Sequence, residues 1–263
     1  MITVLGAGGF IGSHLVRYLR AEGVECWAPG RDEPVAGRPL GHVVYAIGLT
    51  ADFRERPLDT IEAHVCRLLA LVRAASFDSL LYLSSTRVYR GGEAPAREGD
   101  ALRLSPADPE DIYALSKAAG EALVLSLGAR GRVARLSNVY GRGQDQTFLS
   151  MLIDEARDKG RIVLRTAADS SKDYLAVDDA VRLLAGIARE GRHRLYNVAS
   201  GVPVAHGDLA AAIARETSCE VRIEPGAPIV RFPRIDIDRI RAEFGFEPRG
   251  VLADVPDLLA AGR

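Results

Sequence analysis

Met1-Ile-Thr-Val-Leu-Gly-Ala-Gly-Gly-Phe-Ile-Gly12 is the stretch that decides the fold. The run from Ile2 to Leu5 is apolar, largely β-branched and too short for a helix, which predicts a buried parallel strand. Glycines then follow at a spacing of three residues, and apolar residues recur at helical spacing from Ser13 to Arg20. The sequence therefore predicts a strand, a glycine turn and a helix, which is the context that a dinucleotide-binding turn requires.

The three glycines have separate tasks in such a turn. Gly6 permits the tight turn, Gly9 lets the backbone approach a diphosphate, and Gly12 lets the helix lie close against the strand. The helix N-terminus then directs free N–H groups toward the phosphate charge. We predict Phe10 and Ile11, at the start of this helix, as further cofactor-binding residues. The alternative is an ordinary glycine-rich turn.

Composition limits the class of protein. A chain of 263 residues can bury a large core in one domain or in a domain with a small appendage. The formal net charge of −1 gives no general attraction to nucleic acid or membranes. The three cysteines lack CxxC spacing, so neither a disulfide framework nor a metal site is expected. We expect a soluble, cytoplasmic protein, because neither a leader segment nor an apolar run of transmembrane length is found.

The rest of the chain alternates between short apolar strands and segments with helical spacing. This alternation predicts an α/β fold, a Rossmann-type doubly wound parallel sheet with helices on both faces. Between the strands expected at 24–28 and 43–47 there is only a loop with prolines and glycines, too short for a helix and a strand. We therefore predict a sheet whose edge is trimmed after the second strand. A final helix near 238–244 is expected to close the chain.

The end of the second strand indicates which cofactor is selected. An acid there would bind the 2′-hydroxyl of the adenine ribose, whereas a small residue followed by arginine suits a 2′-phosphate. This chain has Gly30 followed by Arg31. The cofactor is therefore NAD(P), with NADP slightly favoured over NAD.

Tyr113 and Lys117 are four residues apart in a predicted helix, so their side chains lie on one face. A tyrosine with an ordinary pKa of about 10 is a poor base at neutral pH, and a nearby ammonium group would lower that pKa. A hydroxyl from Ser85 or Thr86, at the end of a predicted strand, can polarise the same substrate oxygen. The combination suits proton exchange with an alcohol while a nicotinamide accepts or donates the hydride.

Several motifs in this chain order resemble one family. They are the glycine turn, Ser84-Ser85-x-x-Val88-Tyr89, Tyr113-x-x-x-Lys117, Asn138-Val-Tyr-Gly141, Lys172-Asp-Tyr and Tyr196-Asn-Val-Ala-Ser-Gly201. Over most of its length the chain resembles an extended short-chain dehydrogenase/reductase of the NAD-dependent epimerase/dehydratase type, the group that contains UDP-galactose 4-epimerase. The resemblance implies an epimerase or reductase that transfers a hydride at a secondary alcohol or ketone of a sugar, expected to be nucleotide-linked.

The resemblance also implies roles for single residues. Ser85, Tyr113 and Lys117 are implied to be catalytic, with Tyr113 as the acid/base. Thr86, Asn138 and Lys172 are expected to bind substrate; Asn138 falls where the family often contacts a substrate phosphate, and Lys172 replaces an arginine that often binds diphosphate. The full predicted cofactor-binding set is Gly6, Gly9, Phe10, Ile11, Gly12, Arg31, Ala46, Ile47, Gly48, Ser84, Tyr113 and Lys117.

The same resemblance implies a division of the chain into two regions. Residues 1–140 are expected to form the dinucleotide-binding core, to which 173–200 returns, and 141–172 with 201–263 a small substrate-binding region. It also implies a homodimer formed through a bundle that includes the Tyr113 helix.

Two departures from the family pattern carry information. Thr86-Arg87 stands where family dehydratases have an Asp-Glu pair, which argues against a 4,6-dehydratase. His64 replaces an asparagine, and it is either a histidine on the helix surface or a residue near the cofactor. The alternative to an enzyme is a catalytically idle NAD(P)-binding module that senses redox state or regulates a partner. The complete catalytic set argues against that alternative.

Overall fold

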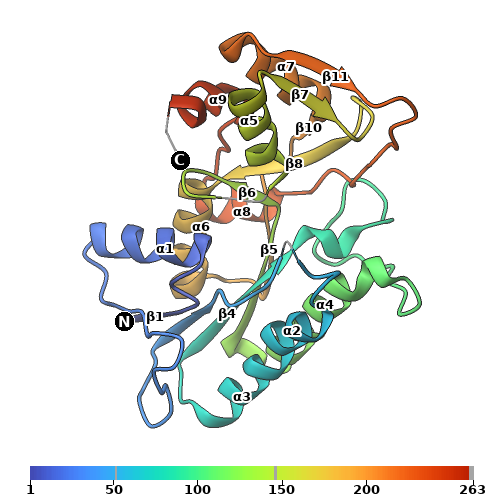
Figure 1. Cartoon of the computed structure of the whole chain (residues 1–263). Helices are drawn as coiled ribbons and strands as arrows, with labels where there is room; N and C mark the ends of the chain where they lie inside the picture. The colour runs from blue at the N-terminus through green and yellow to red at the C-terminus, as the bar shows by residue number, and fades with distance from the viewer. Residues whose placement is uncertain (51, 145–146, 261–263) are drawn as a thin grey trace.

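A six-stranded parallel sheet is the centre of the computed structural model, which describes residues 1–50, 52–144 and 147–260 (Figure 1). Strands covered on both faces need continuous apolar runs, and β1 and β4 are buried along nearly their whole length. The predicted α/β fold of Rossmann type is confirmed. The strands lie in the order β2 (Cys26–Trp27), β1 (Ile2–Leu5), β3 (His42–Tyr45), β4 (Ser79–Ser85), β5 (Gly131–Leu136) and β9 (Leu195–Val198).

The sheet ends at β2, as the short interval after this strand predicts. Across residues 28–41, all of which the structure describes, the chain forms no further strand, and Pro39 makes only an isolated bridge to Ser76. The expected strand at 24–28 is reduced to the two residues of β2. The trimmed edge is therefore confirmed.

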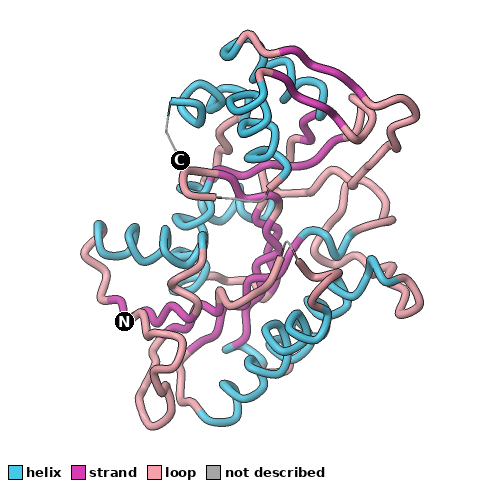
Figure 2. The backbone as a smooth tube through the Cα atoms, in the orientation of Figure 1, coloured by secondary structure: helices cyan, strands magenta, loops and turns pink. Residues whose placement is uncertain are grey.

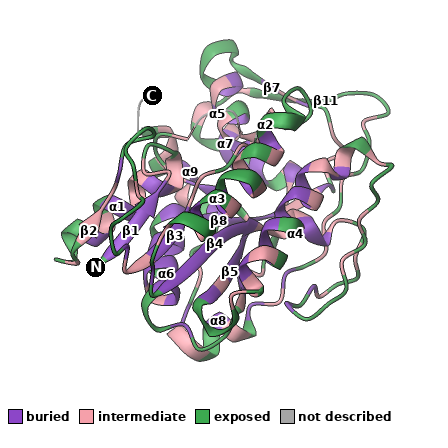
Figure 3. Cartoon of the chain, turned by 90° about the horizontal axis from the view of Figure 1, so that it is seen from below, coloured by how far each residue is buried: buried purple, intermediate pink, exposed green. Residues whose placement is uncertain are grey.

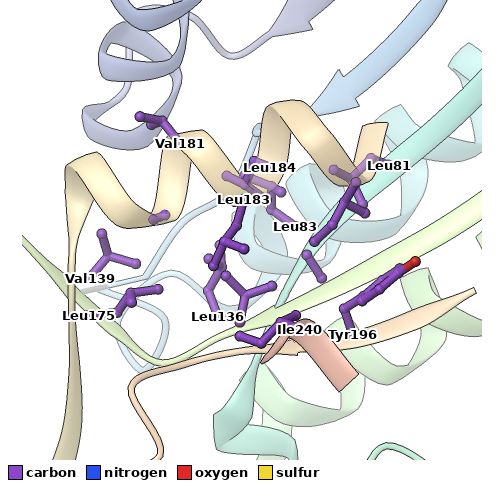
Figure 4. Packing of buried hydrophobic residues seen from close by; sticks show 14 of the residues in the cluster. Leu81, Leu83, Leu136, Val139, Leu175, Val181, Leu183, Leu184, Tyr196 and Ile240 are labelled. Carbon is purple, nitrogen blue, oxygen red and sulfur yellow. The ribbon is translucent and has the colours of Figure 1, made fainter. Parts of the chain in front are cut away.

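Helices cover both faces of the sheet, and the tube in Figure 2 shows them flanking its strands. One face is covered by α1 (Phe10–Ala21) and α6 (Val177–Glu190), which pack against each other. A hydrophobic core lies between these helices and the sheet, and Figure 4 shows Val181, Leu183 and Leu184 of α6 among its side chains. The other face carries α2 (Pro57–Ile61), the π-helical segment η1 (Glu62–Cys66), α3 (Arg67–Ala74) and α4 (Ile112–Leu125).

Burial follows this layered arrangement. In Figure 3 the central strands are coloured as buried, while α2 and α3 turn exposed residues outward. Three short 3₁₀ segments connect elements on this side: η2 (Thr86–Tyr89), η3 (Pro109–Asp111) and η4 (Gly128–Arg130). Helix α8 (Asp238–Phe244), which the sequence predicts, packs against β9 and α6.

A second group of elements has its own hydrophobic core above the carboxyl ends of the central strands (Figure 1). Thr147 and Ser150 form a capping box that starts its first helix, α5 (Phe148–Lys159), and Gly160 ends that helix in the left-handed conformation. Its strands are β6 (Asn138–Tyr140), β8 (Ser171–Ala176) and β10 (Pro203–Ala205) in one sheet and β7 (Arg161–Leu164) and β11 (Glu220–Ile223) in another. Its helices are α5 (Phe148–Lys159), α7 (His206–Thr217) and α9 (Val251–Ala260).

The expectation that the helix near 238–244 closes the chain is wrong. Helix α9 follows it, with Val251 and Val255 buried in the second core. Pro256 lies inside α9 and is a residue type that normally argues against a helix, which explains why the sequence pattern does not predict this one. Among the described residues, no helix has the length and apolarity to cross a membrane.

Candidate functional site

The glycine turn has the geometry that the sequence predicts. Gly6 has a φ of +88°, a conformation that side chains rarely adopt, and its carbonyl oxygen accepts a hydrogen bond from the N–H of Gly9 at 3.0 Å. A Cβ atom on Gly12 would lie 2.2 Å from that same oxygen. Helix α1 therefore begins in close contact with the turn. No side chain in the described part of the chain caps its N-terminus, which leaves its first N–H groups available to an anion.

A cavity of about 500 Å³ opens above this turn, at the carboxyl ends of β1, β3, β4 and β5. This is the edge at which doubly wound folds bind ligands. The cavity is lined by the predicted residues Gly9, Phe10, Ile11, Gly12, Ala46, Ile47, Gly48, Ser84, Ser85, Thr86, Tyr113, Lys117, Asn138 and Lys172. Gly6 lies beneath them in the turn and Arg31 lies outside the cavity.

Arg31 is exposed in the loop after β2. The N–H of Gly30 donates to the Glu33 carboxylate at 3.1 Å, so this acid closes the turn in which Arg31 lies. The preference for NADP stays a prediction.

The three predicted catalytic residues come together in the cavity. Tyr113, on α4, hydrogen-bonds through its hydroxyl to Ser85 at the end of β4 and to Thr50 in the loop after β3. Lys117 lies one turn further along α4, with its Nζ 5.9 Å from the centroid of the Tyr113 ring. Its ammonium group donates to the carbonyl oxygen of Leu83 at 2.8 Å. Strand β4 and helix α4 thus place the three catalytic groups in one site, beside the loop after β3.

The expected lowering of the Tyr113 pKa is wrong for this structure. Burial raises the pKa of Tyr113, and its hydrogen bonds to Ser85 and Thr50 and the charge of Arg87 oppose that rise. Burial also lowers the pKa of Lys117 to about 7, against the influence of Glu121. The sequence does not reveal how deeply both groups are buried, and burial is the largest influence on both pKa values.

His64 is buried, so the interpretation as a surface histidine is wrong. Its Nδ1 is 2.8 Å from Ser116 Oγ, which itself donates to the Tyr113 carbonyl, so Nδ1 carries the proton. Its Nε2 accepts from the N–H of Leu49 at 3.2 Å. Both bonds fit a neutral ring, and burial together with the charge of Lys117 lowers the pKa of His64 far below its ordinary value. His64 thereby ties the Gly48–Leu49 loop to the catalytic helix.

Ser84 turns its hydroxyl away from the cavity. The hydroxyl donates to Glu121, whose carboxylate also pairs with Arg135 at 2.6 Å. Both members of this ion pair are almost completely buried, and Arg135 also donates to the Tyr89 hydroxyl at 2.7 Å. Any contact between Ser84 and a cofactor is therefore left to its backbone.

The predicted substrate-binding residues lie in two parts of the cavity. Asn138 and Lys172 come from β6 and β8, and Thr86 lies beside Ser85. Asn138 Nδ2 donates to the carbonyl of Asp173 at 2.8 Å. The Lys172 ammonium lies 5.1 Å from the centroid of the Phe148 ring, and burial lowers its pKa. Thr86 follows Ser85 directly in η2. Asn138 and Lys172 thus lie on neighbouring strands, β6 and β8.

Sequence reasoning missed several residues of this site. Thr50 bonds to Tyr113, and Phe53 packs against it with 5.4 Å between ring centroids. Arg87 and Tyr174 line the cavity, and each has a buried polar atom without a hydrogen-bond partner among the described residues. The loop that carries Thr50 and Phe53 has no motif. Arg87 is visible in the sequence only as the residue that replaces an expected acid.

The residues present fit a dinucleotide. A glycine turn and an uncapped helix N-terminus suit a diphosphate, and a Cβ on Gly48 would already be 3.4 Å from Lys117 Nζ. A dinucleotide can therefore approach the end of β3 closely because Gly48 has no side chain there. Beyond it lies the Tyr113 hydroxyl, where a proton can be exchanged with a ligand held in the same cavity.

Comparisons with known proteins agree with this geometry. A model of the NAD dependent epimerase/dehydratase family matches residues 2–199. The chain is 27% identical to a dTDP-4-dehydro-6-deoxy-D-allose reductase of Streptomyces bikiniensis, over 94% of this chain and 91% of that protein. It is 32% identical to a GDP-6-deoxy-D-mannose reductase of Pseudomonas aeruginosa, over 76% of this chain and 74% of that protein. A solved UDP-glucose 4-epimerase of Thermotoga maritima with UDP-glucose shares the fold, with a TM-score of 0.84, 18% identity and coverage of 99% and 97%.

Proposed function

Since the chain belongs to the NAD-dependent epimerase/dehydratase family, we propose that it is an NAD(P)-dependent enzyme that transfers a hydride at a secondary alcohol or ketone of a nucleotide sugar. The observation that carries the proposal is the Tyr113 hydroxyl, bonded to Ser85 and close to Lys117, in a cavity that begins at the glycine turn. No observation favours a catalytically idle module.

The chain's own residues divide the work of the reaction. Tyr113 gives a proton to the substrate oxygen during reduction and takes it back during oxidation, while Ser85 orients the same oxygen by a hydrogen bond. Lys117 supplies positive charge beside the phenol when it is protonated. The nicotinamide, when bound, supplies or accepts the hydride. The glycine turn, Ala46, Ile47 and Gly48 are the residues that would hold the dinucleotide.

The site supports an epimerase or a reductase better than a dehydratase. Elimination of water needs an acid or base beside the sugar in addition to Tyr113. Among the described residues that line the cavity, the carboxylate belongs to Asp173, and its two oxygens accept from the N–H groups of Ser200 and Gly201 at 2.9 and 2.7 Å. Arg87 lies where family dehydratases have the acid. The similar proteins include both reductases and dTDP-glucose 4,6-dehydratases, so this preference rests on the residues that line the cavity.

We further propose that the chain forms a homodimer through the outer face of α2 and α4. Leu58 on α2 is 83% exposed, and Ala119 and Ala122 on α4 are exposed as well. Small and apolar residues on two adjacent helices allow close packing against a second copy. We keep the expected division into a core (1–140 with 173–200) and a substrate-binding region (141–172 with 201–263) as a proposal, and likewise a cytoplasmic location.

The experiment that tests the function is the substitution Tyr113→Phe. Loss of the proton-transferring hydroxyl should lower the rate of hydride transfer by roughly 100- to 10,000-fold, the range for general acid–base catalysis. The rate is followed by the absorbance of reduced nicotinamide with UDP-, dTDP- and GDP-linked 4-keto sugars, and epimer formation by chromatography.

The matched control is Tyr18→Phe on α1, which removes a tyrosine hydroxyl that does not line the cavity. It should leave the rate within about twofold. Circular dichroism and nucleotide binding establish that both variants fold. A folded Tyr113→Phe protein with wild-type activity would refute the assigned acid/base.

A further inference from the structure

The cavity carries more positive charge than the catalytic set needs. The cations among its described lining residues are Arg87, Lys117 and Lys172, and the acid is Asp173, whose oxygens are held by backbone N–H groups. Lys117 lies beside Tyr113, and Lys172 lies on β8 beside Phe148. Arg87 has no role in the reaction proposed above. Its charge and its contacts therefore need a separate explanation.

The guanidinium group of Arg87 is only partly satisfied. Its Nη2 donates to Glu110 Oε2 at 3.2 Å, and its Cζ lies 5.0 Å from the centroid of the Phe53 ring. Its Nε is buried and has no hydrogen-bond partner within the part of the chain that the structure describes. A buried N–H donor without an acceptor is unfavourable, so this position suits a ligand that brings an acceptor.

Glu110 does not neutralise Arg87. Both oxygens of this carboxylate also accept from Arg54, whose Nε and Nη2 form the two-pronged arrangement typical of arginine–carboxylate pairs. Two guanidinium groups thus share one carboxylate, which leaves about one positive charge beside the cavity. A carboxylate supplies one negative charge, whereas a phosphate monoester carries about 1.5 to 2 at neutral pH.

Arg87 is close to the reacting group. Phe53 contacts both side chains: its ring lies 5.4 Å from the Tyr113 ring, between centroids, and 5.0 Å from the Arg87 Cζ. In agreement with this geometry, the charge of Arg87 opposes the rise that burial causes in the pKa of Tyr113, and it adds to the lowering that burial causes in the pKa of Lys172. An anion on Arg87 would therefore lie near the substrate oxygen that exchanges a proton with Tyr113.

We propose that Arg87 binds a carboxylate on the sugar ring of the substrate, so that the enzyme prefers nucleotide-linked sugar acids over neutral sugars. This inference rests on the proposed function, because it assumes that the sugar lies against Tyr113. The buried Nε of Arg87 donates to the carboxylate. The negative charge of the carboxylate then balances the positive charge that Glu110 leaves on Arg87. Thr86 and Arg87 then act together as the part of the site that distinguishes one sugar from another.

The test uses pairs of ligands that differ only in this group. UDP-glucuronic acid and UDP-glucose have a carboxylate and a hydroxymethyl group at the same carbon, and the dTDP- and GDP-linked pairs cover the other bases. Affinities are measured by calorimetry with the NAD(P)-loaded protein. We expect the acid of the accepted pair to bind roughly 10- to 100-fold more tightly, the factor that a hydrogen bond to a charged group provides.

Variants then locate the preference. In Arg87→Gln the ratio between acid and neutral sugar should fall to about one, and in Arg87→Lys, which keeps the charge but loses the Nε donor, it should take an intermediate value. Arg103→Gln is the control: it removes one exposed arginine, paired with Glu93, outside the cavity. It should keep the wild-type ratio.

The outcomes separate this inference from the proposed function. Equal binding of acid and neutral sugar by the wild-type protein would overturn the role of Arg87 and leave the proposed function intact. Binding of neither member of any pair would overturn the proposed function, and this inference with it. The wild-type ratio decides the matter even if Arg87→Gln fails to fold.

Discussion

At the scale of the residue, Lys117 is a cation whose surroundings disfavour its charge. It is only 5% exposed, and its ammonium has one carbonyl acceptor and the ring of Tyr82 beside it, with 5.0 Å between Nζ and the ring centroid. Burial lowers its pKa to about 7 from the ordinary 10.5. Such a group is retained for function, since an uncharged residue would suit its surroundings better.

Lys117→Met should therefore stabilise the fold, and the gain should depend on pH. Below about pH 7 the folded protein bears the full unfavourable effect of the buried charge. Between pH 7 and 10.5 the unfolded chain still binds the proton that the folded protein has released, so this effect shrinks as pH rises. We expect the gain in the free energy of unfolding to be roughly 5 kcal/mol larger below neutral pH than near pH 10.5, since each pKa unit corresponds to about 1.4 kcal/mol.

Urea titrations over this pH range measure the effect. Lys159→Met, at an exposed position on α5, is the control and should show no comparable dependence on pH. Hydride transfer should be impaired in Lys117→Met at every pH. A stability gain that is constant with pH would mean that Lys117 is not strained by its burial.

At the scale of the element, the start of α1 shows how tightly the dinucleotide turn is built. A Cβ on Gly12 would be 2.2 Å from the Gly6 oxygen, whereas a Cβ on Gly8 has no atom within 4 Å. Alanine normally favours a helix by about 1 kcal/mol over glycine. Gly12→Ala should nevertheless destabilise the protein by about 1–3 kcal/mol, the range for overpacking, and weaken binding of NAD(P)H.

Gly8→Ala is the matched control in the same turn. It adds the same methyl group in open space and should leave the melting temperature almost unchanged. Thermal melts of the two variants, with and without cofactor, give the comparison. A stabilised Gly12→Ala protein would show that α1 does not depend on this close contact.

Elements that are determined by local sequence could be predicted, whereas contacts made by tertiary packing could not. The β1–turn–α1 unit follows from local pattern alone, because its glycine positions and apolar spacing are set by neighbours within a few residues. The position of His64 is ambiguous in the sequence because the residue lies, buried, in the π-helical segment Glu62–Cys66, where the ordinary helical period does not hold. Thr50, Phe53 and Arg87 meet at Tyr113 only through tertiary packing, and no spacing in the sequence reports that.

At the scale of the whole molecule, the cavity lies between two cores, which bears on how long a cofactor stays bound. Its walls come from the glycine turn and β3 on one side and from β6 and β8 on the other, with Phe232 and Pro233 from a later loop. An epimerase returns the hydride to the same sugar and has no need to release its cofactor in each turnover. A reductase must exchange its cofactor after each hydride.

Denaturing freshly purified protein and identifying any released nucleotide therefore separates the two activities. From Gly30 and Arg31 we expect the purified protein to contain no nucleotide. We also expect it to bind NADPH roughly tenfold more tightly than NADH, because Arg31 can form a charge-assisted hydrogen bond to the 2′-phosphate. Arg31→Ala should remove this preference, while Arg17→Ala, at an exposed position on α1, should keep it. Retained NAD would contradict the role of Arg31 and identify the enzyme as an epimerase.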